Sequence, residues 1–97
     1  MHAAVLSVDI HISQSRSLKD KRSVVRHILD TARRRYSVAA AEVDFQDLRQ
    51  RAALAFSAVG GDAAHVTDVL ENVERFVWSH PEIEVSDVKW SWIDDQS

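Results

Sequence analysis

Four basic residues stand within seven positions near the start of the chain, in a segment that also contains Ser15 and Ser17. Ammonium and guanidinium groups beside hydroxyls can hold a phosphate, most readily where a helix begins and its first amides are free. Together with the next basic residue of the same helix, this segment predicts an anion site for the phosphates of RNA. Its members are Ser15, Arg16, Ser17, Lys19, Lys21, Arg22 and Arg26.

The alternative is that these cations serve only the fold. Arg26–Asp30 and Asp30–Arg34 have the spacing of ion pairs one helical turn apart. Lys21 and Arg22 fall close to the apolar side of the predicted helix, so we expect their stems to lie over the end of the sheet with the charges in water. The remaining cations would then pair with acids of the second half of the chain.

The helix dipole separates two parts of the basic segment. Residues 33–35 are three arginines at the end of the predicted helix, where cations are favourable, so stability alone explains them. Lys19, Lys21 and Arg22 stand at its start, where the dipole opposes each by some tenths of a kcal/mol. These cations need another reason, and an anionic partner is one.

A second group of polar residues could do acid–base or metal chemistry: Asp9, His11, Asp44, Asp47 and Arg51. Asp9 and His11 share one face of a predicted strand, an arrangement that can shuttle a proton or bind a metal. Glu42 and the two later aspartates form an acidic turn with oxygens suited to Mg²⁺. No cysteine and no second histidine at a suitable spacing accompany them. Surface hydrogen bonds, and a turn that positions Arg51 or pairs with the basic helix, are therefore favoured, and we predict no catalytic residue, metal or cofactor.

The elements that position these residues follow from hydrophobic periodicity. Alternating apolar residues indicate strands, and apolar residues at a spacing of three and four indicate amphipathic helices. Ser17 and Asp62 are good N-caps, and Pro81 ends the second helix. The predicted elements are a strand at 3–12, a helix at 17–36, strands at 38–45 and 51–59, a helix from 62 to about 80 and a strand at 82–93. This order predicts an α+β, ferredoxin-like βαββαβ fold, with a four-stranded antiparallel sheet of order 4-1-3-2 and both helices on one face.

Two strands carry an irregular pattern. Glu42 would point toward the core, which predicts a bulge or an early end of the strand. In the last strand the apolar positions change parity near Ser86, so either a bulge keeps both sets inside or Trp90 and Trp92 project onto the open face. In the second case the open face would be an apolar patch that favours a homodimer.

Length and composition indicate one soluble domain. The 97 residues form a single predicted domain, 1–97, with residues 94–97 as a frayed tail. The absence of cysteine excludes disulfides and zinc–thiolate sites, and no apolar run is long enough to span a membrane. No signal peptide is evident, so we expect a cytoplasmic protein.

The net charge of −3 conceals two oppositely charged halves. Residues 16–51 contain ten of the twelve Lys and Arg residues and five of the fifteen acids, whereas residues 52–97 contain two of these cations and nine acids. This split indicates either attraction within the domain or a basic face for an anionic partner.

Several blocks of the sequence resemble the YlxP-like family of small bacterial domains of unknown function. They are residues 8–12, 17–22, 41–44, 46–48 and 50–52, and the resemblance covers nearly the whole chain. It implies a ferredoxin-like fold, and the frequent proximity of such genes to ribosome-maturation and tRNA-modification genes implies an RNA-related role. Phe45 and Arg49 depart from the pattern, where relatives often have His and Trp, so a site that needs the histidine would lack one member here.

These observations predict a non-enzymatic RNA- or ribosome-associated accessory factor that uses the basic side of the first helix. Ribosomal or other structured RNA is the expected partner. We expect no specificity for DNA and no association with a membrane. The central strands offer Ser7, Asp9, Ala53 and Ala55 on the open face, so base stacking on that face is disfavoured. The alternatives are a protein-interaction module, in particular a homodimer through the open face, and a small enzyme of unknown reaction.

Overall fold

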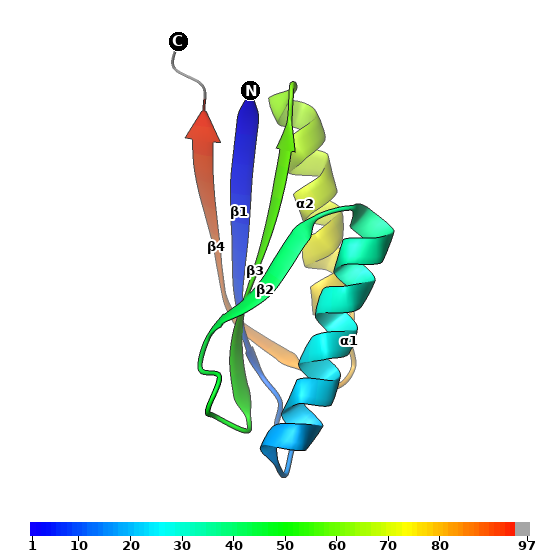
Figure 1. The fold of residues 1–97 in the computed structure, drawn as a ribbon, viewed down its shortest axis with the longest axis vertical. Coiled ribbons are helices and arrows are strands. Elements are labelled where there is room, and N and C mark those ends of the chain that lie inside the picture. Colours follow the sequence, from blue (N-terminus) through cyan, green and yellow to red (C-terminus); the bar gives the residue numbers. More distant parts are fainter. Residues whose placement is uncertain (95–97) are drawn as a thin grey trace.

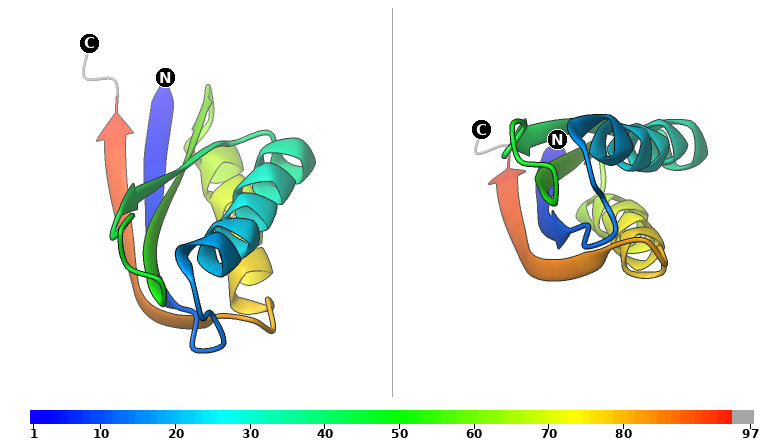
Figure 2. Two further views of the ribbon diagram at one scale, coloured as in Figure 1. Left: turned by 60° about the horizontal axis from the view of Figure 1, so that its bottom comes forward. Right: turned by 90° about the horizontal axis from the view of Figure 1, so that it is seen from below.

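The computed structural model describes residues 1–94, and its elements follow the predicted order. The strands pair antiparallel in the order β2-β3-β1-β4, which is the predicted order counted from the other edge. Both helices cover the same face of this twisted sheet (Figures 1 and 2). The ferredoxin-like prediction is therefore confirmed, with the elements β1 His2–His11, α1 Leu18–Tyr36, β2 Ala39–Asp44, β3 Arg51–Gly60, α2 Ala63–Trp78 and β4 Glu84–Asp94.

The core lies between the sheet and the two helices. Leu6, Val8 and Ile10 alternate along the central strand β1 and are fully or almost fully buried, as the period of two requires. The helices contribute Ile28 from α1 and Leu70 from α2 to the same cluster. Neither helix of the described residues combines the length and the apolar run that crossing a membrane requires.

Both helices begin at the predicted caps. Ser17 Oγ accepts a hydrogen bond from the amide of Asp20 at 3.0 Å, and Asp62 Oδ1 accepts one from the amide of Ala64 at 2.9 Å. The carboxylate of Asp20 bonds back to the amide of Arg16 at 3.1 Å, one residue before the usual capping-box position. These bonds fix the start of α1 and occupy amide groups there.

A bulge in each edge strand resolves the irregular patterns. The β2–β3 register shifts between Glu42 and Asp44, as the inward-pointing glutamate predicted. The β1–β4 register shifts opposite Asp9 and Ile10, where Ser86 is the extra residue of β4. Both apolar sets of β4 therefore face the helices.

The second bulge places the tryptophans of β4 on the helix side of the sheet. Trp90 lies opposite Leu6, and its Nε1 donates to Glu74 Oε1 of α2 at 3.1 Å. Trp92 lies opposite Ala4 on the same side and is 41% exposed. The sequence favoured a homodimer only if the tryptophans lay on the open face, and they lie on the other face. The homodimer stays a prediction.

Strand β4 ends one residue later than predicted. Asp94, the first residue of the predicted tail, ends strand β4. The other residues of that tail, 95–97, lie outside the described part of the chain.

Candidate nucleic-acid interface

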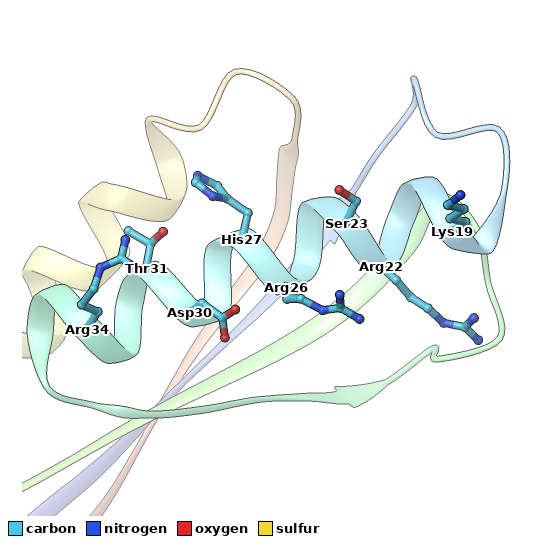
Figure 3. A pocket seen from close by; sticks show the side chains of 8 residues that line it. All are labelled: Lys19, Arg22, Ser23, Arg26, His27, Asp30, Thr31 and Arg34. Carbon is cyan, nitrogen blue, oxygen red and sulfur yellow. The ribbon is translucent and has the colours of Figure 1, made fainter.

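The outward side of α1 carries a basic groove of about 590 Å³. Successive turns of the helix supply its lining, so its geometry is that of a regular helix anchored to the core by residues such as Ile28. Arg22 and Arg26 extend from the same side of α1, one turn apart, while Ser23 and His27 project from the other side (Figure 3). We call this the α1 groove; its lining residues are Lys19, Arg22, Ser23, Arg26, His27, Asp30, Thr31 and Arg34.

The cations of the α1 groove are exposed and have no ion-pair partner among residues 1–94. Asp30 is the acid of the groove, and it pairs with Arg33 at 2.9 Å. The predicted pairs of Asp30 with Arg26 and Arg34 are therefore not formed. Because Asp30 already has a partner, the groove keeps four uncompensated positive charges: Lys19, Arg22, Arg26 and Arg34.

The opposite charges of the two halves of the chain do not meet as ion pairs. Within the described residues, no Lys or Arg of residues 16–51 forms an ion pair with an acid of residues 52–94. The ion pairs of Lys21, Arg33 and Arg51 all join residues of the first half of the chain. One alternative was that the cations serve only the fold by pairing with acids of the second half. Within the described residues, that pairing is wrong.

A second hollow, of about 320 Å³, lies between α1 and β2. It shares Arg22 and Arg26 with the α1 groove and adds Arg33 and Glu42. The guanidinium of Arg33 also donates to the carbonyl of Ala40 in β2. Arg22 and Arg26 thus form a ridge between two hollows.

The serines of the predicted anion site serve the cap of α1 instead. Ser15 is buried, and its hydroxyl donates to the carbonyl of Ser17 at 3.0 Å. Ser17 Oγ and the carboxylate of Asp20 accept from backbone amides at the start of the helix. The structure brings Arg16, Lys19 and Arg22 near the start of α1, where the two serines and Asp20 are engaged in the cap.

Lys21 is fully buried, which the sequence did not predict. Its Nζ lies 2.8 Å from Glu42 Oε2 and donates to the carbonyl of Phe45 at 2.6 Å. The expectation that its charge lies in water is wrong, because its ammonium group is buried against Glu42 of β2 and the turn that follows β2. Glu42 Oε2 is buried and accepts no well-directed hydrogen bond among the described residues, so the ion pair with Lys21 is what compensates its charge. Lys21 therefore belongs to the fold and is not available to a ligand.

The same contact holds the turn after β2. Phe45 has a positive φ of 63°, a conformation that costs a bulky residue of order 1–3 kcal/mol. Its carbonyl accepts hydrogen bonds from Lys21 Nζ and from the amide of Leu48, and its ring lies 3.9 Å from the guanidinium carbon of Arg51. Phe45 is thus a fixed part of this turn.

The predicted polar site is only partly assembled. Arg51 lies 3.6 Å from Asp9 on the open face of the sheet, and His11 is the register neighbour of Arg51 across the β1–β3 pair. Asp44 accepts a bond from the amide of Phe45, and Asp47 is exposed in the turn. No group of three or more His, Asp or Glu residues in positions 1–94 is arranged to hold a metal ion.

A pair of histidines borders the α1 groove. The rings of His27 and His80 meet edge to face at 5.8 Å between centroids. Burial lowers the pKa of His80 below its ordinary 6.5; the neighbouring Glu82 opposes this shift and His27 adds to it. The folded protein therefore favours the neutral form of His80.

This preference predicts a loss of stability in mild acid. Well above pH 6.5 His80 is neutral in both states, whereas as the pH falls toward and below 6.5 the unfolded chain takes up the proton first. We expect the urea midpoint to fall as the pH is lowered through 6.5, and His80→Gln to reduce that fall. His65→Gln, which removes an exposed imidazole of α2, is the matched control. Equal curves for the wild type and His80→Gln would contradict the prediction.

The predicted anion site lacked five residues of the groove: Ser23, His27, Asp30, Thr31 and Arg34. The signal was present in their spacing, because residues 19, 23, 27, 31 and 34 follow one side of a helix at intervals of three and four. Arg34 was assigned to the dipole-stabilised end of α1 together with its neighbours. The structure separates them, because Arg33 pairs with Asp30 and Arg35 lies over Tyr36 at 5.5 Å, whereas Arg34 lines the groove.

Fold and site together define a small ferredoxin-like domain whose first helix presents an uncompensated basic groove. The chain belongs to the family described as "Protein of unknown function (DUF503)", which matches residues 3–90. It is 33% identical over 76 residues to the "Uncharacterized protein YlxP" of Bacillus subtilis (strain 168), an alignment that covers 78% of this chain and 83% of the relative. The resemblance to YlxP-like domains is thus confirmed.

Among solved structures, the chain is similar to one titled "Structure of the REP associates tyrosine transposase bound to a REP hairpin". The match has a TM-score of 0.46 and 13% sequence identity. It covers 97% of this chain and 57% of the other, so the chain spans little more than half the length of that protein.

Proposed function

We propose that this protein is a non-enzymatic RNA- or ribosome-associated accessory factor that contacts RNA phosphates through the α1 groove. The observation that carries the proposal is the set of four exposed cations on one helix that have no ion-pair partner in the described chain. A fold gains little from such a set, because like charges on neighbouring turns repel. An anionic partner neutralises these cations, so relief of their mutual repulsion adds to the binding free energy.

The position of these charges supports contact with a large partner. The α1 groove lies along an outward face of the molecule and is not enclosed, so an extended polyanion can reach several cations at once (Figure 3). Lys19 and Arg22 are on the first turns of α1, where the helix dipole opposes them, and an anion there also interacts favourably with the helix N-terminus. Phosphate contacts of this kind position a protein on RNA without reading bases.

Binding of ribosomal RNA at two salt concentrations tests the proposal. Four phosphate contacts give a slope of about −3.6 for log K against log salt, so affinity should fall on the order of 100-fold between 50 and 200 mM salt. Lys19→Glu with Arg22→Glu should abolish most of the binding in gel-shift titrations.

The matched control is Arg49→Glu with Arg75→Glu, which changes the net charge equally at two exposed positions outside the groove. This variant should bind far better than the α1 variant. No binding of the wild type at low salt, or equal loss in both double variants, would show that the α1 groove is not an RNA site.

A further inference from the structure

We infer that the α1 groove takes the phosphate backbone of double-stranded RNA, without sequence preference, rather than single-stranded RNA. This inference rests on the proposed function and names its partner more closely. Three features of α1 carry it: the shape formed by its arginines, the absence of a stacking surface, and the rigidity of the helix.

The first feature is the ridge formed by Arg22 and Arg26. Both residues line the α1 groove on one side and the hollow against β2 on the other. Their guanidinium groups therefore project between two hollows, as the close-up of α1 shows for one side (Figure 3). A convex cationic ridge suits the outside of a duplex, where phosphates stand out in rows, because the groups it must reach are already exposed.

The second feature is the lack of Phe, Tyr and Trp rings in the α1 groove. Single-stranded RNA is bound chiefly by stacking its bases on aromatic side chains, at about 1–3 kcal/mol per base. The lining of the α1 groove contains no Phe, Tyr or Trp, and the ring of His27 packs against His80. Tyr36, at the end of α1, is covered by Arg35 and packs against Phe76. The groove therefore offers charge without a stacking platform.

The open face of the sheet does not supply such a platform either. Its central positions in the β1–β3 register are Ser7 opposite Ala55 and Asp9 opposite Ala53. Trp90 and Trp92 lie on the other face, opposite Leu6 and Ala4. Within residues 1–94, the two surfaces considered for a single strand are the α1 groove and the open face of the sheet. Neither combines the groove cations with an aromatic ring that is free to stack on a base.

The third feature is the fixed spacing of the charges. α1 is held at its start by the Ser17 cap and the buried Lys21 pair, and along its length by core residues such as Ile28. At 1.5 Å per residue, Lys19, Arg26 and Arg34 stand about 10 and about 12 Å apart along the axis. A rigid row of charges gains most from a partner whose phosphates are also held in a regular array, because neither side loses flexibility on binding.

Fluorescence anisotropy with one labelled RNA strand tests the inference on the whole protein. The strand contains only adenine and cytosine, so that it does not fold on itself, and has about 16 nucleotides, the span of a double-stranded-RNA-binding module. It is titrated alone and annealed to its complement, at the same salt concentration. We expect the duplex to bind about tenfold more tightly, and a second duplex of unrelated sequence to bind equally well.

Equal or tighter binding of the single strand, or a clear preference for one duplex sequence, would overturn the inference while leaving an RNA-binding function in place. If the protein binds neither the duplex, nor the single strand, nor ribosomal RNA, the proposed function itself is overturned. For the duplex, Arg22→Gln with Arg26→Gln should reduce the salt slope by about 2, since each lost phosphate contact removes about 0.9. Arg49→Gln with Arg75→Gln should leave the slope unchanged, and an equal reduction there would locate the duplex elsewhere.

Discussion

Replacing Lys21 with methionine is expected to lower the free energy of unfolding by about 3–5 kcal/mol, because it leaves a buried carboxylate without its counter-charge. Lys21 is fully buried, and its Nζ is 2.8 Å from Glu42 Oε2 and 2.6 Å from the carbonyl of Phe45. Methionine has a similar volume and would fill the space, so the loss would report the polar contacts and not a cavity. Urea denaturation followed by tryptophan fluorescence measures the change.

The double variant Lys21→Met with Glu42→Met separates pairing from burial. Removing both charges together removes the unpaired carboxylate, so the double variant should be more stable than either single variant, as is usual when apolar residues replace a buried ion pair. Additive losses in this double-mutant cycle would contradict the ion pair that the structure places beneath β2.

Deletion of Ser86 is expected to cost about 3 kcal/mol or more, because it removes the bulge that keeps both apolar sets of β4 on the helix side. Without the extra residue, one set must turn to the open face: either Ile83 and Val85, or Val88 and Trp90. The second outcome would expose Trp90 and break its bond to Glu74, which a red shift of the tryptophan emission would reveal.

Ser86→Ala is the matched control for this deletion. It keeps the bulge and removes only the exposed hydrogen bond from the Ser86 hydroxyl to the carbonyl of Asp9. We expect a change of about 1 kcal/mol or less. A deletion variant as stable as Ser86→Ala would show that the register of β4 is not fixed at this position.

Much of the architecture follows from the sequence because it depends on local signals. The alternation of Leu6, Val8 and Ile10 gives β1, and the caps Ser17 and Asp62 start the helices where predicted. The bulge at Ser86 was one of two alternatives. The change of parity in the sequence indicates either a bulge or apolar residues on the open face, but it does not distinguish between them. Packing of Trp90 beneath α2 decided it.

The burial of Lys21 could not be derived from its own surroundings in the sequence. A lysine on the first turns of a helix, beside the apolar stripe, is ordinarily explained by a stem over the core and a charge in water. What decides its position is Glu42, 21 residues later and on another element. The strand pattern showed that Glu42 points inward, but it did not show what Glu42 contacts. Its pairing with Lys21 becomes evident only when the fold brings β2 against α1.

At the start of α1, the serines of the predicted phosphate site have another role for a more local reason. Asp20 was expected to cap the helix, and its carboxylate accepts from the amide of Arg16, while Ser17 Oγ accepts from the amide of Asp20. The hydroxyl of Ser15 donates to the carbonyl of Ser17, so both serines serve the cap. Of the predicted site, Lys19, Arg22 and Arg26 line the α1 groove, where Arg34 joins them.

The bulge at Ser86 also changes the free edge of the sheet. β4 is an edge strand of 11 residues, and its outer row of amides and carbonyls has no neighbour in the sheet. A long regular edge is a template on which another chain can add a strand. The extra residue breaks the repeat of that row, and the charges of Asp87 and Lys89 stand beside the break on the open face. The irregularity that keeps Trp90 inside the molecule therefore also makes its longest free edge a poor template for aggregation.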